Sequence, residues 1–174
     1  AVAWDGGNWC VTWGEYAMAY VARVTSTGAL LDPGSVAVAG VQTGPTAGNG
    51  AGAIHLIWSM YTNGAYGDYD VFTTNISPSN VAGPSRTLSV GAPQQLRPEV
   101  ATSGDGSMLV YRSSANLSSR VLAQPLDAAG NPLTAEPVQL DTGPSLNGPG
   151  SPNVAWNGSL YLVSWGASNG IVAQ

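Results

Sequence analysis

VAWNGSLYLVSW, at residues 154–165, decides the fold, because related stretches occur three more times in the chain. The other copies begin near Val2, Gly48 and Pro98. Each copy closes on an aromatic residue, and these residues, spaced 45, 53 and 54 positions apart, are Trp13, Trp58, Tyr111 and Trp165. Self-similarity at a nearly constant period indicates one structural unit that is repeated.

Within each copy, short β-prone runs alternate with turn residues, which predicts four antiparallel strands joined as a meander. In the third copy these runs are 98–102, 107–112, 120–126 and 137–140. In the second copy, the turn after the first run is predicted at Gly48-Asn49-Gly50. The turn before the fourth strand places Gly28, Asn80 and Gly130 at one aligned position. We expect a left-handed backbone there, because Gly and Asn adopt positive φ at low cost.

The second run of each copy is apolar on both faces. In the first copy Trp9, Val11 and Trp13 share one face, and Cys10 and Thr12 share the other. A strand that is covered on both sides has this composition. The closing aromatic residues are therefore predicted to be structural and to pack between neighbouring units.

Repeated four-stranded meanders of this length are typical of the blades of a β-propeller. We therefore expect an all-β chain with one incomplete propeller of about three and a half blades. The predicted blades are approximately 1–45, 46–95, 96–147 and 148–174. The fourth copy stops within its third strand, so that the ring would be completed by the remainder of a longer chain or by a second copy. A four-bladed monomer and a flat β-sandwich are the alternatives.

The pattern VAW-[DN]-G-x-x-[YW]-L-V-x-W, seen at 154–165, resembles the repeats of large secreted bacterial proteins with β-propeller character. The third strand and its turn resemble those repeats too, at 21–28, 70–77 and 123–130. The second copy departs most, since Gly48-Asn49-Gly50 replaces the Ala-Trp-Asp/Asn-Gly pattern. The resemblance implies a propeller in a bacterial protein that is secreted or at the cell surface. It implies no particular activity, because such proteins are mostly uncharacterised modules.

The composition excludes several kinds of partner. Only 9% of the 174 residues are charged, lysine is absent, and five arginines against ten acids give a net charge of −5. Nucleic acids and anionic membrane surfaces are not expected as partners, because both require clustered basic residues. The longest apolar run, at 160–165, is too short for membrane insertion. The lack of lysine and the abundance of Gly, Ser, Thr and Asn favour export.

The sequence contains no recognisable catalytic constellation. His55, the only histidine, aligns with Cys10, so we expect both to be packing residues. Asp68 and Asp70 are alternating carboxylates of a kind that can bind Ca²⁺, but the calcium-loop pattern is missing, and a solvated loop is the alternative. No other metal or cofactor motif occurs. Without a suitably separated carboxylate pair for glycoside hydrolysis, we predict that the protein is not an enzyme.

Tyrosines gather in two loops, at 14–20 and 59–69, that a propeller would place on one face. The connections 40–47, 91–97 and 142–151 would lie on the same face. The candidate ligand-binding residues are Tyr16, Tyr20, Tyr61, Asn63, Tyr66, Asp68 and Tyr69. Tyrosine among small polar residues is adaptable recognition chemistry. We therefore predict a non-enzymatic extracellular recognition or adhesion module that binds a glycan or a surface protein. A purely structural module of a larger surface protein and a secreted glycan-active enzyme are the alternatives, and the tyrosines would then cover blade edges.

Overall fold

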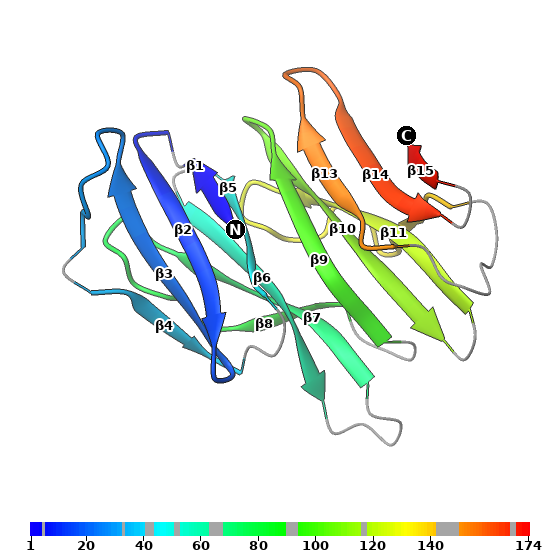
Figure 1. Cartoon of the computed structure of the whole chain (residues 1–174), viewed down its shortest axis with the longest axis horizontal. Coiled ribbons are helices and arrows are strands. Elements are labelled where there is room, and N and C mark those ends of the chain that lie inside the picture. Colours follow the sequence, from blue (N-terminus) through cyan, green and yellow to red (C-terminus); the bar gives the residue numbers. More distant parts are fainter. Residues whose placement is uncertain are drawn as a thin grey trace.

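The computed structural model describes residues 1–4, 6–32, 34–40, 44–50, 53–62, 68–89, 94–115, 118–141, 150–167 and 170–174. These residues form fifteen β-strands in four antiparallel sheets, with no helix among them. The prediction of an all-β chain is confirmed. Figure 1 shows the sheets in chain order, from blue to red. Over the described ranges, no helix is long and apolar enough to cross a membrane.

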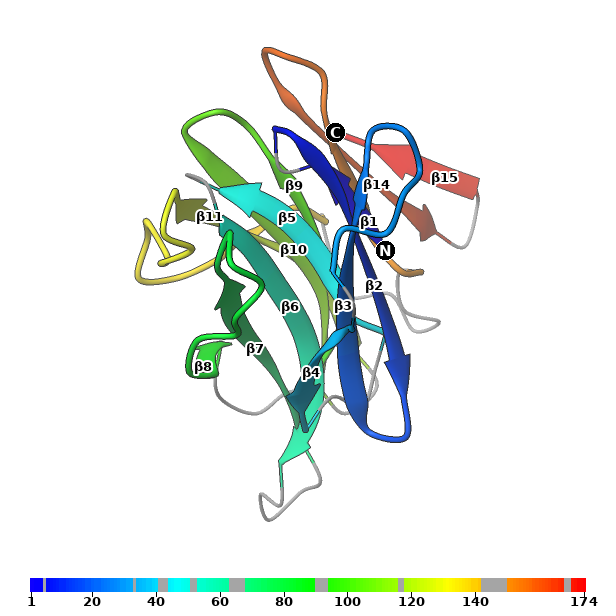
Figure 2. The same ribbon diagram turned by 90° about the vertical axis from the view of Figure 1, so that its left-hand side faces the viewer.

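Each sheet is a meander in which consecutive strands are hydrogen-bonded neighbours. Sheet 1 holds β1 (Val2–Trp4), β2 (Asn8–Glu15), β3 (Met18–Thr25) and β4 (Val36–Ala39). Sheet 2 holds β5 (Thr46–Gly50), β6 (Ala53–Thr62), β7 (Asp68–Ile76) and β8 (Arg86–Ser89). Sheet 3 holds β9 (Gln94–Thr102), β10 (Gly106–Ala115), β11 (Ser118–Asp127) and β12 (Val138–Gln139). Sheet 4 holds β13 (Asn153–Trp156), β14 (Tyr161–Ala167) and β15 (Gly170–Ala173). The first strands adjoin one another, as Figure 2 shows for β1, β5 and β9.

Three hydrophobic clusters join the sheets, and each cluster draws on two consecutive sheets. The face that carries the repeated aromatic residue packs against the opposite face of the preceding sheet. The groupings are Trp58 with Cys10 and Val21, Tyr111 with Ile57 and Val71, and Trp165 with Val110 and Val121. Trp58, Tyr111 and Trp165 are only 1%, 1% and 5% exposed. The apolar composition of both faces of the second strand therefore serves two different interfaces.

The aromatic face of sheet 1 packs against no other sheet in the described part of the chain. Trp13 is 39% exposed and stacks on Tyr20, with 5.6 Å between ring centroids. Trp9 is 44% exposed and packs on Trp4, with 4.9 Å between centroids. The repeated aromatic residue is thus enclosed at three of its four positions and open at the first.

The turn between the third and fourth strands has a left-handed residue in each complete sheet. The φ angles of Gly28, Asn80 and Gly130 are +88°, +60° and +77°, which confirms the prediction. The turn in sheet 3 also lies against sheet 2. A Cβ at Gly130 would lie 2.8 Å from Nδ1 of His55, so that glycine is required there for space as well.

The predicted turn at Gly48-Asn49-Gly50 is wrong, because these residues lie within β5. A Cβ at Gly48 would lie 2.8 Å from Cγ2 of Thr102 and 3.1 Å from Cγ1 of Val100. Glycine here lets β5 approach β9 closely, a role that glycine also has inside strands. The hairpin of sheet 3 is also longer than predicted, since β10 continues to Ala115 and β11 begins at Ser118.

Candidate functional site

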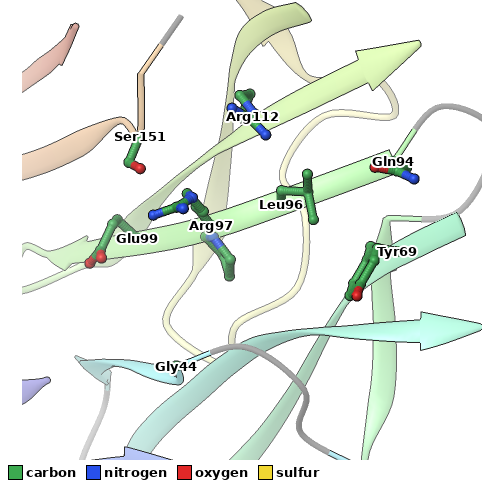
Figure 3. Close-up of a pocket in the computed structure, with 9 residues that line it drawn as sticks. Gly44, Tyr69, Gln94, Leu96, Arg97, Glu99, Arg112 and Ser151 are labelled. Carbon is green, nitrogen blue, oxygen red and sulfur yellow. The ribbon is translucent and has the colours of Figure 1, made fainter. Parts of the chain in front are cut away.

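A cavity of about 610 Å³ opens where sheets 2 and 3 meet the segment that leads into sheet 4. This volume is within the range of about 300–1,000 Å³ that is usual for small-molecule sites. Its polar lining consists of Tyr69, Gln94, Arg97, Glu99, Arg112 and Ser151. In Figure 3, Arg97, Glu99 and Ser151 lie toward one end of the cavity, and Gln94 and Tyr69 lie toward the other.

Three lining residues occupy one position of the repeat. Gly44, Arg97 and Ser151 each immediately precede a proline, which comes just before β5 and β13 but lies in the middle of β9. Because β9 lies between β5 and β13, the three residues at this repeat position come together at the same cavity. The residue before the repeated proline is therefore the sequence signal for the cavity, and it lies outside the predicted tyrosine-rich loops.

A β-bulge places Arg97 at the cavity. The register of β9 and β10 shifts between Val110 and Arg112, so that Arg97 and Pro98 together lie opposite Tyr111. Arg97 has a φ of +54°, a conformation that costs a residue with a side chain about 1–2 kcal/mol. Glycine usually occupies the left-handed position of such bulges. A strained residue at a cavity is a structural reason to look for function there.

The cavity holds the two arginines that the fold leaves unpaired. The other three are used inside the structure, with Arg23 paired to Asp32 at 2.6 Å, Arg120 to Asp141 at 3.9 Å, and Arg86 donating to Asn131 and to the Ala129 carbonyl. Within the described ranges, the side chains of Arg97 and Arg112 form no hydrogen bond or ion pair, and Nε of Arg112 is buried without a partner. A guanidinium group is a cation that can donate up to five hydrogen bonds.

Glu99 is the one carboxylate among the described residues that line the cavity. Burial raises the pKa of Glu99, because the ionised form loses contact with water. A hydrogen bond of 3.1 Å from Oγ1 of Thr46 to Oε2 of Glu99 acts in the opposite direction and lowers that pKa. Glu99 forms no ion pair with Arg97 or Arg112. Its carboxylate can therefore accept a hydrogen bond from a ligand hydroxyl.

Of the predicted tyrosine set, Tyr69 lines the cavity. Tyr61 packs edge-on against Tyr69, with 5.4 Å between ring centroids. Tyr20 lies on the open face of sheet 1, and Tyr16 is 92% exposed at the tip of the β2–β3 hairpin. The predicted residues that lie outside the described ranges are Asn63 and Tyr66. The structure does not bring the described tyrosines together at one site.

Asp68 and Asp70 lie at the beginning of β7 and are not among the residues that line the cavity. Asp70 is 7% exposed, and its Oδ2 accepts a hydrogen bond of 3.0 Å from Oγ1 of Thr62. Across the residues that the structure describes, no three side chains of His, Cys, Asp and Glu gather as a metal site.

His55 joins sheets 2 and 3. Its Nδ1 lies 2.7 Å from Oδ1 of Asn75, and its Nε2 lies 3.1 Å from the carbonyl oxygen of Ala128. His55 is 1% exposed, and Cys10, at the aligned position of sheet 1, is fully buried. Both side chains pack between sheets, and neither lines the cavity.

No protein-family model matches the chain, and no curated protein matches it in sequence. The site is therefore interpreted from its own geometry and chemistry.

Proposed function

We propose that the protein is a non-enzymatic recognition module, that its sheets are blades of an incomplete β-propeller, and that its ligand occupies the cavity. The convergence of Gly44, Arg97 and Ser151 on this cavity carries the proposal. The residue type differs at each of the three positions, whereas the proline that follows is the same. Such an arrangement uses a fixed repeat as the scaffold and one variable position as the contact with a ligand.

The chemistry of the lining favours recognition over catalysis. Two guanidinium groups, an amide, two hydroxyl groups and one aromatic ring can all form specific contacts. The glycan-active alternative needs two carboxyl groups on either side of the bond that is cleaved, and Glu99 alone stands in the described lining. An extracellular location in a bacterium is part of the proposal. The lack of lysine and the resemblance of residues 154–165 to secreted repeats support it.

A panel of immobilised neutral and acidic glycans tests the proposal. We expect the wild-type chain to bind, and we expect Tyr69→Ala, inside the cavity, to weaken binding. Tyr16→Ala is the matched control, because Tyr16 is exposed far along a hairpin that does not line the cavity. Absence of binding to every glycan, or equal losses from both variants, would contradict the proposal. Turnover of a chromogenic glycoside would replace it with the enzymatic alternative.

A structural role is the second candidate, and the open face of sheet 1 favours it. Trp4, Trp9 and Trp13 form an exposed aromatic surface there. In sheets 2 to 4, the same face is covered by the opposite face of the preceding sheet. On sheet 4 that opposite face is itself open, since Leu162 is 53% exposed. The occupant that these interfaces predict is therefore sheet 4 of a second copy of this chain.

Light scattering over a range of protein concentrations tests this second role. We expect the wild-type chain to associate. Trp9→Ser should remain monomeric and folded, with a loss of stability of about 2 kcal/mol, because Trp9 is 44% exposed and packs on Trp4. A wild-type chain that is monomeric at every concentration would exclude association through this face.

A further inference from the structure

We propose that the ligand of the cavity is a carbohydrate with a single carboxylate, of the hexuronic acid class, and that Arg97 and Arg112 hold this carboxylate. The inference rests on the proposed recognition function and specifies its ligand. It is carried by the placement at one cavity of two arginines whose side chains have no partner among the described residues.

A planar guanidinium group matches the geometry of a carboxylate, with which it forms two parallel hydrogen bonds. Arg112 projects from the regular part of β10, and its buried Nε has no partner in the described structure. An orphaned buried donor is costly unless a ligand or water satisfies it. A carboxylate in the cavity would satisfy this donor and the charge of Arg112 together.

Arg97 supports the same ligand, because its left-handed backbone conformation is unfavourable for a residue with a side chain. Glycine would fit the φ of +54° without strain. The bulge nevertheless carries an arginine, whose side chain lies at the cavity (Figure 3). The guanidinium group, rather than the fold, accounts for an arginine at this position.

The other lining groups fit the hydroxyl-bearing part of a sugar. Glu99 can accept a hydrogen bond from a hydroxyl, and the Ser151 hydroxyl can either donate or accept one. The ring of Tyr69, fixed against Tyr61, offers an aromatic face for the C–H surface of a pyranose. Glu99, when ionised, disfavours phosphate more than a single carboxylate, because the repulsion of a dianion is about twice that of a monoanion.

The charge of the whole chain favours one carboxylate over a polyanion. A net charge of −5 repels a long acidic polymer along the protein surface. Charges farther apart than about 8 Å are largely screened at physiological ionic strength. A single carboxylate inside the cavity therefore experiences Arg97 and Arg112 more than the distant acids.

Calorimetric titration of the full chain with D-galacturonate and D-glucuronate, and with their neutral methyl esters, tests the inference. We expect at least one acid to bind about tenfold more tightly than its ester, as one charge-assisted hydrogen bond would give. Arg97→Gln and Arg112→Gln should each remove that difference. A second pair of variants leaves both arginines in place and changes Gly44, which also lines the cavity. Gly44→Glu should weaken the binding of the acids far more than Gly44→Gln does, because it adds a negative charge. A Cβ at Gly44 meets no atom within 4 Å, so that both replacements should fold.

The outcomes separate the two proposals. If acids and esters bind equally, or if the arginine variants keep the preference, the uronate inference fails while the recognition function stands. If inorganic phosphate or an N-acetylated dipeptide binds more tightly than every uronate, the ligand class is wrong. If none of the acids, the esters or the wider glycan panel binds, the recognition function itself fails. Thermal unfolding of each variant must match that of the wild type, and a binding loss in a variant that passes this control counts as support.

Discussion

Replacing Trp58 with alanine should destabilise the protein much more than the same replacement at Trp13, although both residues close the second strand of a repeat. Trp58 is 1% exposed between sheets 1 and 2. A side chain of this kind buries about 150–250 Å², which corresponds to about 4–6 kcal/mol. Trp13 is 39% exposed, so that its burial corresponds to about 2–4 kcal/mol on the same scale. Alanine retains part of this area, and at Trp13 solvent fills the space. We expect losses of about 4–5 kcal/mol for Trp58→Ala and about 2 kcal/mol for Trp13→Ala.

Urea unfolding followed by far-ultraviolet circular dichroism measures both losses as differences in the free energy of unfolding. The comparison requires equal m-values, since a changed m-value signals a changed unfolding transition. Repeating the titrations at tenfold different protein concentrations separates folding from association. Equal losses at the two positions, or a larger loss at Trp13, would refute the reasoning. Either result would mean that the aromatic face of sheet 1 is as enclosed as that of sheet 2.

Four further predictions follow from local geometry. Arg97→Gly should relieve the φ of +54° and raise the free energy of unfolding by about 0.5–1 kcal/mol, while uronate binding is lost in calorimetry; Arg97→Ala should show the loss without the gain. Burial raises the pKa of Glu99 above its usual 4.5. The wild type should therefore lose stability as pH rises from that usual value through the raised pKa. Glu99→Gln should remove this dependence from urea midpoints measured from pH 4 to 7. The two-residue turn of the β2–β3 hairpin has φ angles of +48° at Tyr16 and +63° at Ala17. The double change to Asn-Gly should raise the free energy of unfolding in urea by about 1–2 kcal/mol, without altering glycan binding. Gly48→Ala should cost about 1–3 kcal/mol, because its Cβ would lie 2.8 Å from Cγ2 of Thr102, and an unchanged midpoint would show that β5 and β9 are not so close.

Much of the fold could be predicted from the repeat, because strand and turn composition recurs in register. The left-handed turn residue is the clearest case, since Gly28, Asn80 and Gly130 share only their tolerance of positive φ. Gly48 shows the limit of this approach. Glycine serves both for turns and for close contact of two strands, and a single sequence does not distinguish these uses.

The candidate site was much less predictable. Arg97 reaches the cavity through a bulge, and the shift of register depends on how β9 pairs with β10. Tyr69 was predicted with its neighbours as part of a loop, but it lies within β7, where strand pairing separates it from Tyr16 and Tyr20. The unpaired state of Arg97 and Arg112 becomes visible only when the partners of the other arginines are known. Each of these features depends on contacts between sheets, which local sequence does not specify.

The three hydrophobic clusters also determine the order in which the sheets should unfold. Among the described residues, each cluster joins only one sheet to the next, and no single hydrophobic core holds all four sheets. Structures with such nearest-neighbour contacts lose their units one at a time. A pulling force applied to the two ends of the chain would therefore detach sheets stepwise, and the cavity would lose Ser151 from its lining when sheet 4 leaves. Amide hydrogen exchange should follow the same order, with the slowest exchange in sheets 2 and 3, which are covered on both faces.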